Sequence, residues 1–154
     1  MRMTSDGLRK TPLNDWHHEH GGKMVEFAGW EMPIQYEPGI LAEHLATRRF
    51  GGLFDISHMG RFRVEGRNAV AFLQHTLSNN AEALEPWQAH YTLIPDQWGS
   101  VIDDAYLYRF GRREYLLVVN AANRDKDRVH LASHARAFPG VELTDVTGRL
   151  AMFA

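Results

Sequence analysis

The chain contains no cysteine, which excludes disulfides, zinc sites with thiolate ligands and a cysteine nucleophile. It has no apolar run near the roughly 20 residues of a membrane-spanning helix, and its first ten residues lack the apolar segment of a secretion signal. A net charge of −2 on 154 residues gives no general signature of nucleic-acid binding. With 44% hydrophobic and 23% charged residues, the composition is globular, and we expect a cytoplasmic protein.

Two adjacent aspartates interrupt a strand pattern over residues 101–108, which follows a turn at Gly99 and Ser100. Successive side chains on a strand point to opposite faces, so Asp103 and Asp104 cannot share one role. The face of Asp104 also carries Ile102, Tyr106 and Tyr108, and that of Asp103 carries Val101, Ala105 and Leu107. At least one charge therefore lies beside an apolar or aromatic surface and needs a partner or a function. The alternative is that one aspartate caps the turn and the other faces solvent.

The second part of the chain has a regular pattern of apolar residues from Phe62 onward. It predicts strands at 62–65, 90–94, 101–110, 115–120 and 141–146, and helices at 68–77 and 123–138. Asn123 is the expected cap of the second helix, and Asp125 and Asp127 in its first turn favour the helix dipole. The order β-α-β-β-β-α-β is close to a split βαβ plan, an antiparallel sheet with two helices on one face.

The first part of the chain is less regular. Its pattern predicts a short helix within 13–20, a strand at 23–27, a turn at 28–33, an extended piece at 34–36, a helix at 39–50 and a strand at 53–60. The run His17-His18-Glu19-His20 is interpreted as a polar helix end before Gly21-Gly22, because metal sites usually take ligands from separate elements. We therefore expect no metal, and domain limits at 1–60, 61–146 and 147–154.

Four stretches, in order, carry a resemblance to a known family. They are Lys23 to Pro33 (KMVEFAGWEMP), Leu53 to Gly60 (LFDISHMG), Val101 to Asp104 (VIDD) and Leu117 to Asn123 (LVVNAAN). From about Thr11 to its end, the chain resembles the N-terminal portion of the glycine-cleavage T-proteins, which are tetrahydrofolate-dependent aminomethyltransferases. The resemblance implies an α+β fold in which a split βαβ domain follows the start of a folate-binding domain.

The resemblance also implies a reaction, in glycine catabolism and one-carbon metabolism. An aminomethyl group on the lipoyl arm of the H-protein passes to tetrahydrofolate, which gives 5,10-methylenetetrahydrofolate and ammonia. By similarity, Asp104 is the key acidic residue, and it contacts folate together with Met59, Tyr91, Val118 and Asn120. A fixed carboxylate suits this chemistry because positive charge develops on the one-carbon unit during the transfer.

The chain departs from the family pattern at two places. Ser100 stands where the family usually has glycine, and Leu77-Ser78-Asn79-Asn80 stands for Thr-Thr-Asn-Asp, which removes a carboxylate. Two alternatives share the fold: a folate-dependent demethylase or oxidase domain, and a non-catalytic folate-binding module. A third possibility is a folding unit that binds nothing.

The end of the chain and one charged segment carry two further expectations. The apolar run 150–154 stops without a turn or a polar tail, so we expect the chain to be a fragment that is inactive by itself. A local excess of arginine gives either a solvated face or a docking patch for the acidic H-protein. Its members are Arg48, Arg49, Arg61, Arg63 and Arg67.

Overall fold

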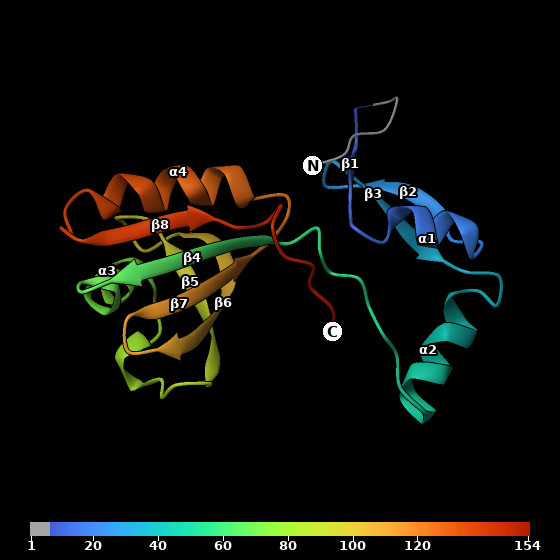
Figure 1. Cartoon of the computed structure of the whole chain (residues 1–154), viewed down its shortest axis with the longest axis horizontal. Coiled ribbons are helices and arrows are strands. Elements are labelled where there is room, and N and C mark those ends of the chain that lie inside the picture. The colour runs from blue at the N-terminus through green and yellow to red at the C-terminus, as the bar shows by residue number, and fades with distance from the viewer. Residues whose placement is uncertain (1–6) are drawn as a thin grey trace. The chain divides into compact units, whose positions relative to one another are not determined.

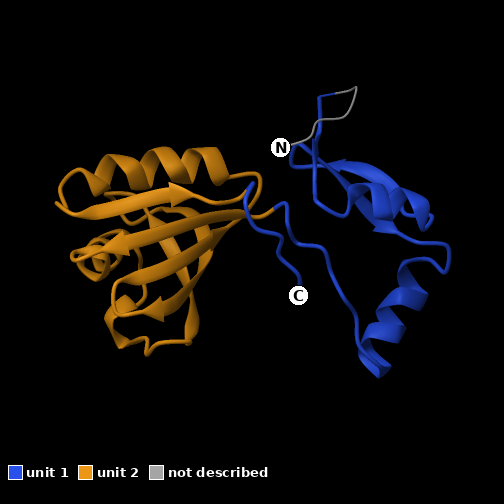
Figure 2. Cartoon of the chain, viewed as in Figure 1, with its two compact units in different colours: residues 1–58, 148–154 blue, residues 59–147 orange. Residues whose placement is uncertain are grey.

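The computed structural model describes residues 7–154 (Figure 1). The chain divides into two compact units, which Figure 2 shows in different colours. Unit 1 comprises residues 1–58 and 148–154, and unit 2 comprises residues 59–147. Within the described part of the chain, no helix is long and apolar enough to cross a membrane.

Unit 2 is one antiparallel sheet with two helices. Its elements, in chain order, are β4 (Gly60–Gly66), α3 (Ala69–Thr76), a short 3₁₀ helix η1 (Ala81–Ala83), β5 (Ala89–Pro95), β6 (Val101–Gly111), β7 (Glu114–Val119), α4 (Arg124–Ala135) and β8 (Val141–Asp145). The strand order is β5-β6-β7-β4-β8, and all four neighbouring pairs are antiparallel. Strands β8, β4, β7 and β6 with α3 and α4 form the split βαβ unit, and β5 extends it at one edge (Figure 1).

The core of unit 2 lies between one face of the sheet and both helices. Phe72 and Leu73 of α3 and Leu131 of α4 are fully buried there. The strands contribute alternate side chains to the same core, namely Phe62 and Val64, Ala105 and Leu107, and Tyr115, Leu117 and Val119. This alternation confirms the predicted α+β class and the split βαβ plan, because one strand face is apolar and the helices cover it.

Two local predictions for unit 2 were wrong. The β5–β6 ladder has an irregularity where Ile94 pairs with Asp103 and Pro95 with Val101, so Ile102 is an extra residue. Ile102 therefore packs against the core and does not share the face of Asp104. Asn123 occupies the N-cap position of α4, but its side chain caps nothing and instead binds Asp103.

Unit 1 is a small sheet with two helices. Its elements are β1 (Arg9–Lys10), α1 (Asn14–Glu19), β2 (Lys23–Phe27), β3 (Trp30–Gln35) and α2 (Ile40–Arg49). The strand order is β1-β3-β2, with β1 parallel and β2 antiparallel to β3. The turn between β2 and β3 is Ala28-Gly29 alone, and both residues have positive φ, 52° and 77°. A two-residue turn of this kind matches strand twist, so Trp30 to Pro33 are strand residues and not the predicted turn.

The segment 53–60 forms no continuous strand before β4 begins at Gly60, contrary to prediction. Within unit 1, residues 54–56 pair with residues 152–154 through a bridge between Asp55 and Phe153. Three backbone hydrogen bonds of 2.9–3.1 Å support this pairing. The predicted helix at 39–50 is present as α2, but none of its residues is buried.

Candidate functional site

The two adjacent aspartates of β6 lie on opposite faces of the sheet in unit 2. Asp103 points to the side that carries Ala105, Leu107 and the helices, and only 4% of it is exposed. Asp104 is half-buried on the other face and pairs with Leu93 of β5 across the ladder. The parity of the strand therefore gives the two carboxylates different environments, as the sequence predicted.

Asn120, the residue after β7, connects the two carboxylates. Its Nδ2 donates to Oδ1 of Asp104 at 2.7 Å and to Oδ1 of Asp103 at 2.9 Å. Its backbone N–H donates to Oδ2 of Asp103 at 3.1 Å. Because both the backbone and the side chain of Asn120 are tied to Asp103, the amide that meets Asp104 has a fixed position.

Asp103 is the most heavily hydrogen-bonded carboxylate of this cluster. Besides Asn120, the Asn123 Nδ2 donates to its Oδ1 at 2.7 Å. Burial alone would raise the pKa of Asp103, but the hydrogen bonds from Asn120 and Asn123 hold it below its ordinary value. Asp103 is therefore ionised, and it binds Asn120 and Asn123 on the face of the sheet that the helices cover. Asp104 presents its carboxylate on the opposite face.

Tyr91 lies beside Asp104 on that face. It pairs with Tyr106 of β6, which follows Asp104 by two residues on the same side of the strand. Partial desolvation, together with the charge of Asp104 and a hydrogen bond to it, raises the pKa of the exposed Tyr91 phenol. The phenol therefore keeps its proton at neutral pH. Tyr106 and Tyr108, with ring centroids 5.3 Å apart, add further aromatic surface on this strand.

The two remaining predicted site residues are Met59 and Val118. Gly60 pairs with Val119, so Met59 and Asn120 lie at the same end of the neighbouring strands β4 and β7. Val118 pairs with Tyr106 and Arg61, and only 2% of it is exposed. The structure thus gathers Asp104, Asn120 and Tyr91, with Met59 near them in the ladder, while Val118 offers almost no open surface.

The first histidine of the run at residues 17–20 lies in the interior of unit 1. His17 is buried, and its ring nitrogens contact the hydroxyl of Tyr36 at 2.6 Å and Oδ2 of Asp55 at 3.1 Å. His17 therefore links α1 to Tyr36 and Asp55 inside unit 1 and does not belong to the predicted polar helix end. No group of three or more histidine, aspartate or glutamate side chains among residues 7–154 could hold a metal ion.

One of the five arginines, Arg61, cannot belong to an exposed docking patch, whereas Arg48, Arg49, Arg63 and Arg67 are exposed. Only 1% of Arg61 is exposed, and its guanidinium donates to the backbone oxygens of Met59 at 3.0 Å and Thr147 at 2.5 Å. Arg63 contacts Glu65 at 3.1 Å and Glu114 at 2.9 Å. Spacing along the chain could not show that Arg61 turns inward.

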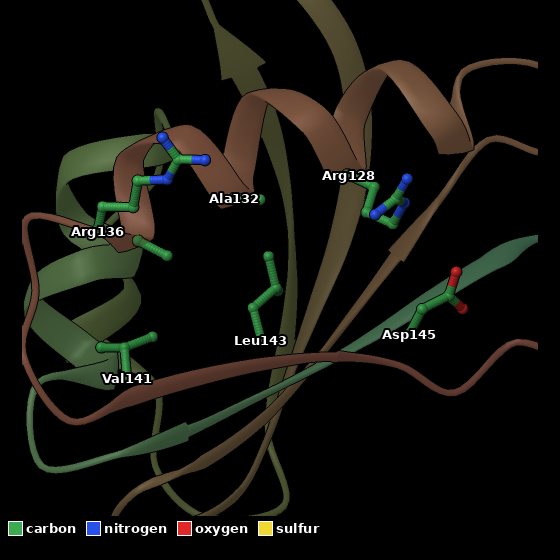
Figure 3. Close-up of a pocket in the computed structure, with 7 residues that line it drawn as sticks. Arg128, Ala132, Arg136, Val141, Leu143 and Asp145 are labelled. Carbon is green, nitrogen blue, oxygen red and sulfur yellow. The ribbon is translucent and has the colours of Figure 1, made fainter.

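Unit 2 also has a pocket of about 430 Å³ between α4 and β8 (Figure 3). Arg128 and Arg136 stand over a floor that includes Val141 and Leu143. Asp145 at its rim is engaged by the Arg124 guanidinium at 2.5 Å. None of the predicted site residues lines this pocket.

Within the departure at Leu77–Asn80, Asn80 forms a local contact. Oδ1 of Asn80 accepts the backbone N–H groups of Glu82 at 3.1 Å and Ala83 at 3.3 Å, which starts η1. Asparagine supplies the same acceptor oxygen as aspartate in this position. The missing carboxylate therefore leaves the local turn intact.

Sequence reasoning missed the part that Asn123 and Asp127 play in the cluster. Asn123 was predicted to cap α4, and Asp127 was assigned to the helix dipole. The structure places both side chains against Asp103, and Asp127 is completely buried. The available signal was the spacing of Asp127 and Leu131, which lie one helical turn apart on the same buried side.

The fold and the cluster define an α+β chain whose sheet domain presents one fixed carboxylate beside a tyrosine. Residues 13–154 match the family model described as the GCVT N-terminal domain. The chain therefore belongs to the T-protein family of the glycine cleavage system.

Individual relatives agree with this membership. Aminomethyltransferases of Thermus thermophilus and Deinococcus deserti are 50% and 48% identical over 147 residues, which are 96% of this chain and 42% and 41% of those proteins. The crystal structure of glycine cleavage system aminomethyltransferase T from Bartonella henselae matches with a TM-score of 0.87 and 38% identity, over 92% of this chain and 39% of that one. The chain thus spans about two fifths of these relatives, and the predicted family and fold class are confirmed.

Proposed function

We propose that this chain supplies the catalytic carboxylate of a tetrahydrofolate-dependent aminomethyl transfer. The aminomethyl group arrives on a sulfur of the lipoyl arm of the H-protein. The bonds from its carbon to sulfur and to nitrogen break, and two bonds to nitrogens N5 and N10 of tetrahydrofolate form. Ammonia leaves, the sulfur recovers a proton, and 5,10-methylenetetrahydrofolate is the product. The setting would be the cytoplasm.

The geometry of Asp104 is the observation that carries this proposal. Its carboxylate is held by the 2.7 Å hydrogen bond from Asn120 on a face where Tyr91 and Tyr106 expose aromatic surface. A carboxylate accepts hydrogen bonds from the N–H groups of a reduced pterin, and tyrosine rings suit its flat body. The residues present therefore fit tetrahydrofolate as the second substrate.

The carboxylate would act by electrostatics, not as a nucleophile. Positive charge develops on the one-carbon unit as the carbon leaves sulfur, and a fixed anion beside it lowers the energy of that state. Asn120 holds Asp104 before substrate arrives, so little reorganisation is needed during the reaction. Tyr91 keeps its proton at neutral pH and can help to orient the same carboxylate.

The partner and the other contacts follow from family membership. The lipoylated H-protein is the proposed donor, but Arg61 cannot belong to its docking surface because the side chain is buried. Contacts of folate with Met59, Asn120 and Val118 remain predictions. Further folate contacts would come from the part of the longer relatives that this chain does not match.

The test is a chimera in which this chain replaces the matching 147-residue segment of the Thermus thermophilus aminomethyltransferase. Asp104→Ala should lower the rate of aminomethyl transfer by about a hundredfold or more, as for loss of a preorganised electrostatic group. The control is Asp125→Ala, which removes an exposed carboxylate in α4 and should change the rate less than about twofold. Unchanged transfer in the Asp104 variant would refute the assignment.

A second measurement concerns the chain alone. Anaerobic calorimetry with tetrahydrofolate should show weak binding or none, because the chain matches only about two fifths of its relatives. Asp103→Ala is not a suitable control here, since Asp103 anchors Asn120 and Asn123. Tight binding by the chain alone would mean that its own residues complete the folate site.

A further inference from the structure

Asp127 is a carboxyl group in the interior of unit 2 that forms no ion pair with the residues the structure describes. It lies in the first turn of α4, none of its surface is exposed, and neither oxygen accepts a hydrogen bond from a described residue. The polar group that faces it is the carboxyl group of Asp103 on β6. Two ionised carboxylates offer only acceptors to each other, so a hydrogen bond between them requires a proton on one.

The hydrogen bonds around the pair locate that proton on Asp127. Asp103 accepts three N–H bonds from Asn120 and Asn123, which favour its ionised form. Asp127 accepts none. Burial, followed by the hydrogen bond to Asp103 and its negative charge, raises the pKa of Asp127 to about 8.

The other charge near the pair acts in the opposite direction. The positive charge of Lys126 lowers the pKa of Asp127, but its Nζ donates to the carbonyl oxygen of Ile102 at 2.8 Å. The groups contributed by the end of β7 and the start of α4, Asn120 and Asn123, are neutral. Asp103 and Lys126 are therefore the charged groups that act on Asp127 from the elements packed around it.

A continuous path of hydrogen bonds runs from this pair to Asp104. Asp127 contacts Asp103, and Asp103 holds both the backbone N–H and the side-chain amide of Asn120. The same amide nitrogen donates at 2.7 Å to Asp104. An amide nitrogen carries two hydrogens, so one can serve each aspartate. A shift of the Asp103 carboxylate would therefore move the donor that orients Asp104.

We propose that Asp127 is a positioning residue for Asp104: in its protonated form it donates to Asp103, which holds Asn120 against the Asp104 carboxylate. This inference rests on the proposed function only in giving Asp104 a catalytic role. When Asp127 loses its proton, the pair loses its hydrogen bond and gains repulsion. The hold on Asn120 then weakens at alkaline pH.

The variant Asp127→Asn separates this role from simple packing. Asparagine has nearly the same shape and donates through its amide at every pH, so the path to Asp104 should become independent of pH. Asp125→Asn, in the same turn of α4 but exposed, is the matched control. A residue that merely fills space would leave the pH behaviour of Asn120 the same in all three proteins.

The primary experiment is NMR on the isotopically labelled 154-residue chain between pH 5.5 and 9.5. In the unsubstituted chain and in Asp125→Asn, the Asn120 side-chain amide and the Asp104 carboxyl carbon should shift together, with the midpoint of the Asp127 carboxyl carbon near pH 8. In Asp127→Asn this shared step should be absent. A step that persists in Asp127→Asn, or Asn120 signals that ignore the titration of Asp127, would overturn the proposal. If Asp127→Asn fails to fold, the unsubstituted chain still tests the proposal, because the Asn120 signals must follow the titration of Asp127 there.

The chimera supplies the functional readout. Its transfer rate at saturating substrate should fall at least tenfold above pH 8, and Asp127→Asn should remove that fall. Asp127→Leu, which cannot donate, should lower the rate about tenfold to a hundredfold at every pH, as expected for a misplaced catalytic group. A rate that falls equally with pH in the unsubstituted and Asp127→Asn chimeras would contradict the positioning role. A chimera without any transfer would count against the proposed function, while the NMR titration would still decide the positioning role.

Discussion

The two units of the chain differ in how much of their apolar surface is buried. Unit 2 closes an apolar core between its sheet and both helices, with Phe72, Leu107 and Leu131 fully buried. In unit 1 the helix α2 buries none of its residues, and 72% of Leu41 and 90% of Phe50 are exposed. The side chains that unit 1 does bury include several polar ones, among them Asn14, His17 and Ser57.

The difference explains why the candidate site lies where it does. The hydrogen bonds from Asn120 to the two carboxylates, 2.7–3.1 Å long, join β6 to the end of β7, and both strands contribute side chains to the core of unit 2. Functional groups on strands of a packed sheet keep their geometry better than groups on loops. Unit 1 is held together by the β2–β3 hairpin, the pairing of residues 54–56 with 152–154 and a few polar side-chain hydrogen bonds. Its stability should therefore depend on fewer interactions than that of unit 2.

Expressing the two units as separate fragments should have the largest effect on folding. Residues 59–147 expressed alone should fold cooperatively, because the fragment contains the whole sheet and both covering helices. Residues 1–58 alone should not, because they lack the segment 152–154 that pairs with residues 54–56. Dispersed amide NMR signals and a sigmoidal urea transition would identify the folded fragment. A folded 1–58 fragment, or an unfolded 59–147 fragment, would reverse the comparison.

A matched pair of helix leucines should show the next largest effect. Leu131→Ala in α4 removes a fully buried side chain and should cost about 2–5 kcal/mol of unfolding free energy. Leu41→Ala in α2 removes an exposed one and should cost less than about 0.5 kcal/mol. Urea denaturation followed by residue-resolved hydrogen exchange measures each unit separately. A large cost at Leu41 would show that α2 has a packed face.

Acid should weaken unit 1 through Asp55. Burial alone would raise the pKa of Asp55, but hydrogen bonds from Ser57 and His17 hold it below its ordinary value. A carboxylate with a lowered folded-state pKa stabilises the protein above its unfolded-state pKa, and this contribution is lost as pH falls through the folded-state value. Hydrogen exchange in unit 1 should therefore accelerate below about pH 4.

The substitution Asp55→Asn tests that explanation. At pH 6 it should cost about 1–3 kcal/mol, as for loss of a hydrogen-bonded buried charge. It should also flatten the acid dependence of exchange in unit 1, whereas Glu19→Gln on the exposed side of α1 should do neither. An unchanged acid dependence in Asp55→Asn would assign the effect to other carboxylates.

The fold of unit 2 was predictable from its sequence, while that of unit 1 was only partly so. Strands β4 and β8 of unit 2 alternate apolar and polar residues, and α3 has one apolar side, so local pattern and burial agree there. In unit 1 the helix α2 was predicted and is present, but none of its residues is buried, so its pattern gives no information on how it packs. The segment 53–60 resembled a strand but pairs only around Asp55, because its partner lies about a hundred residues away in sequence.

The candidate site was predictable only for the residues on β6. Strand parity separates Asp103 from Asp104 without any knowledge of the fold. The contacts of Asn120, Asn123 and Asp127 depend on how β7 and α4 meet β6, which no local pattern specifies. The resemblance supplied Asn120 as a folate contact, but it could not show that the same amide links two carboxylates.

The smallest effect is expected at Arg63 in unit 2, where the sequence suggested a docking patch. Its guanidinium contacts Glu65 at 3.1 Å and Glu114 at 2.9 Å, and these two glutamates lie directly opposite each other in the β4–β7 ladder. Arg63→Ala therefore removes two exposed ion pairs and uncovers a like-charge pair, which should cost about 0.2–1 kcal/mol and less in high salt. Arg61→Ala, two residues earlier, should cost more, because it removes buried hydrogen bonds to Met59 and Thr147. Urea titrations at two salt concentrations measure both; equal costs, or a cost at Arg63 that salt leaves unchanged, would contradict the exposed character of this pair.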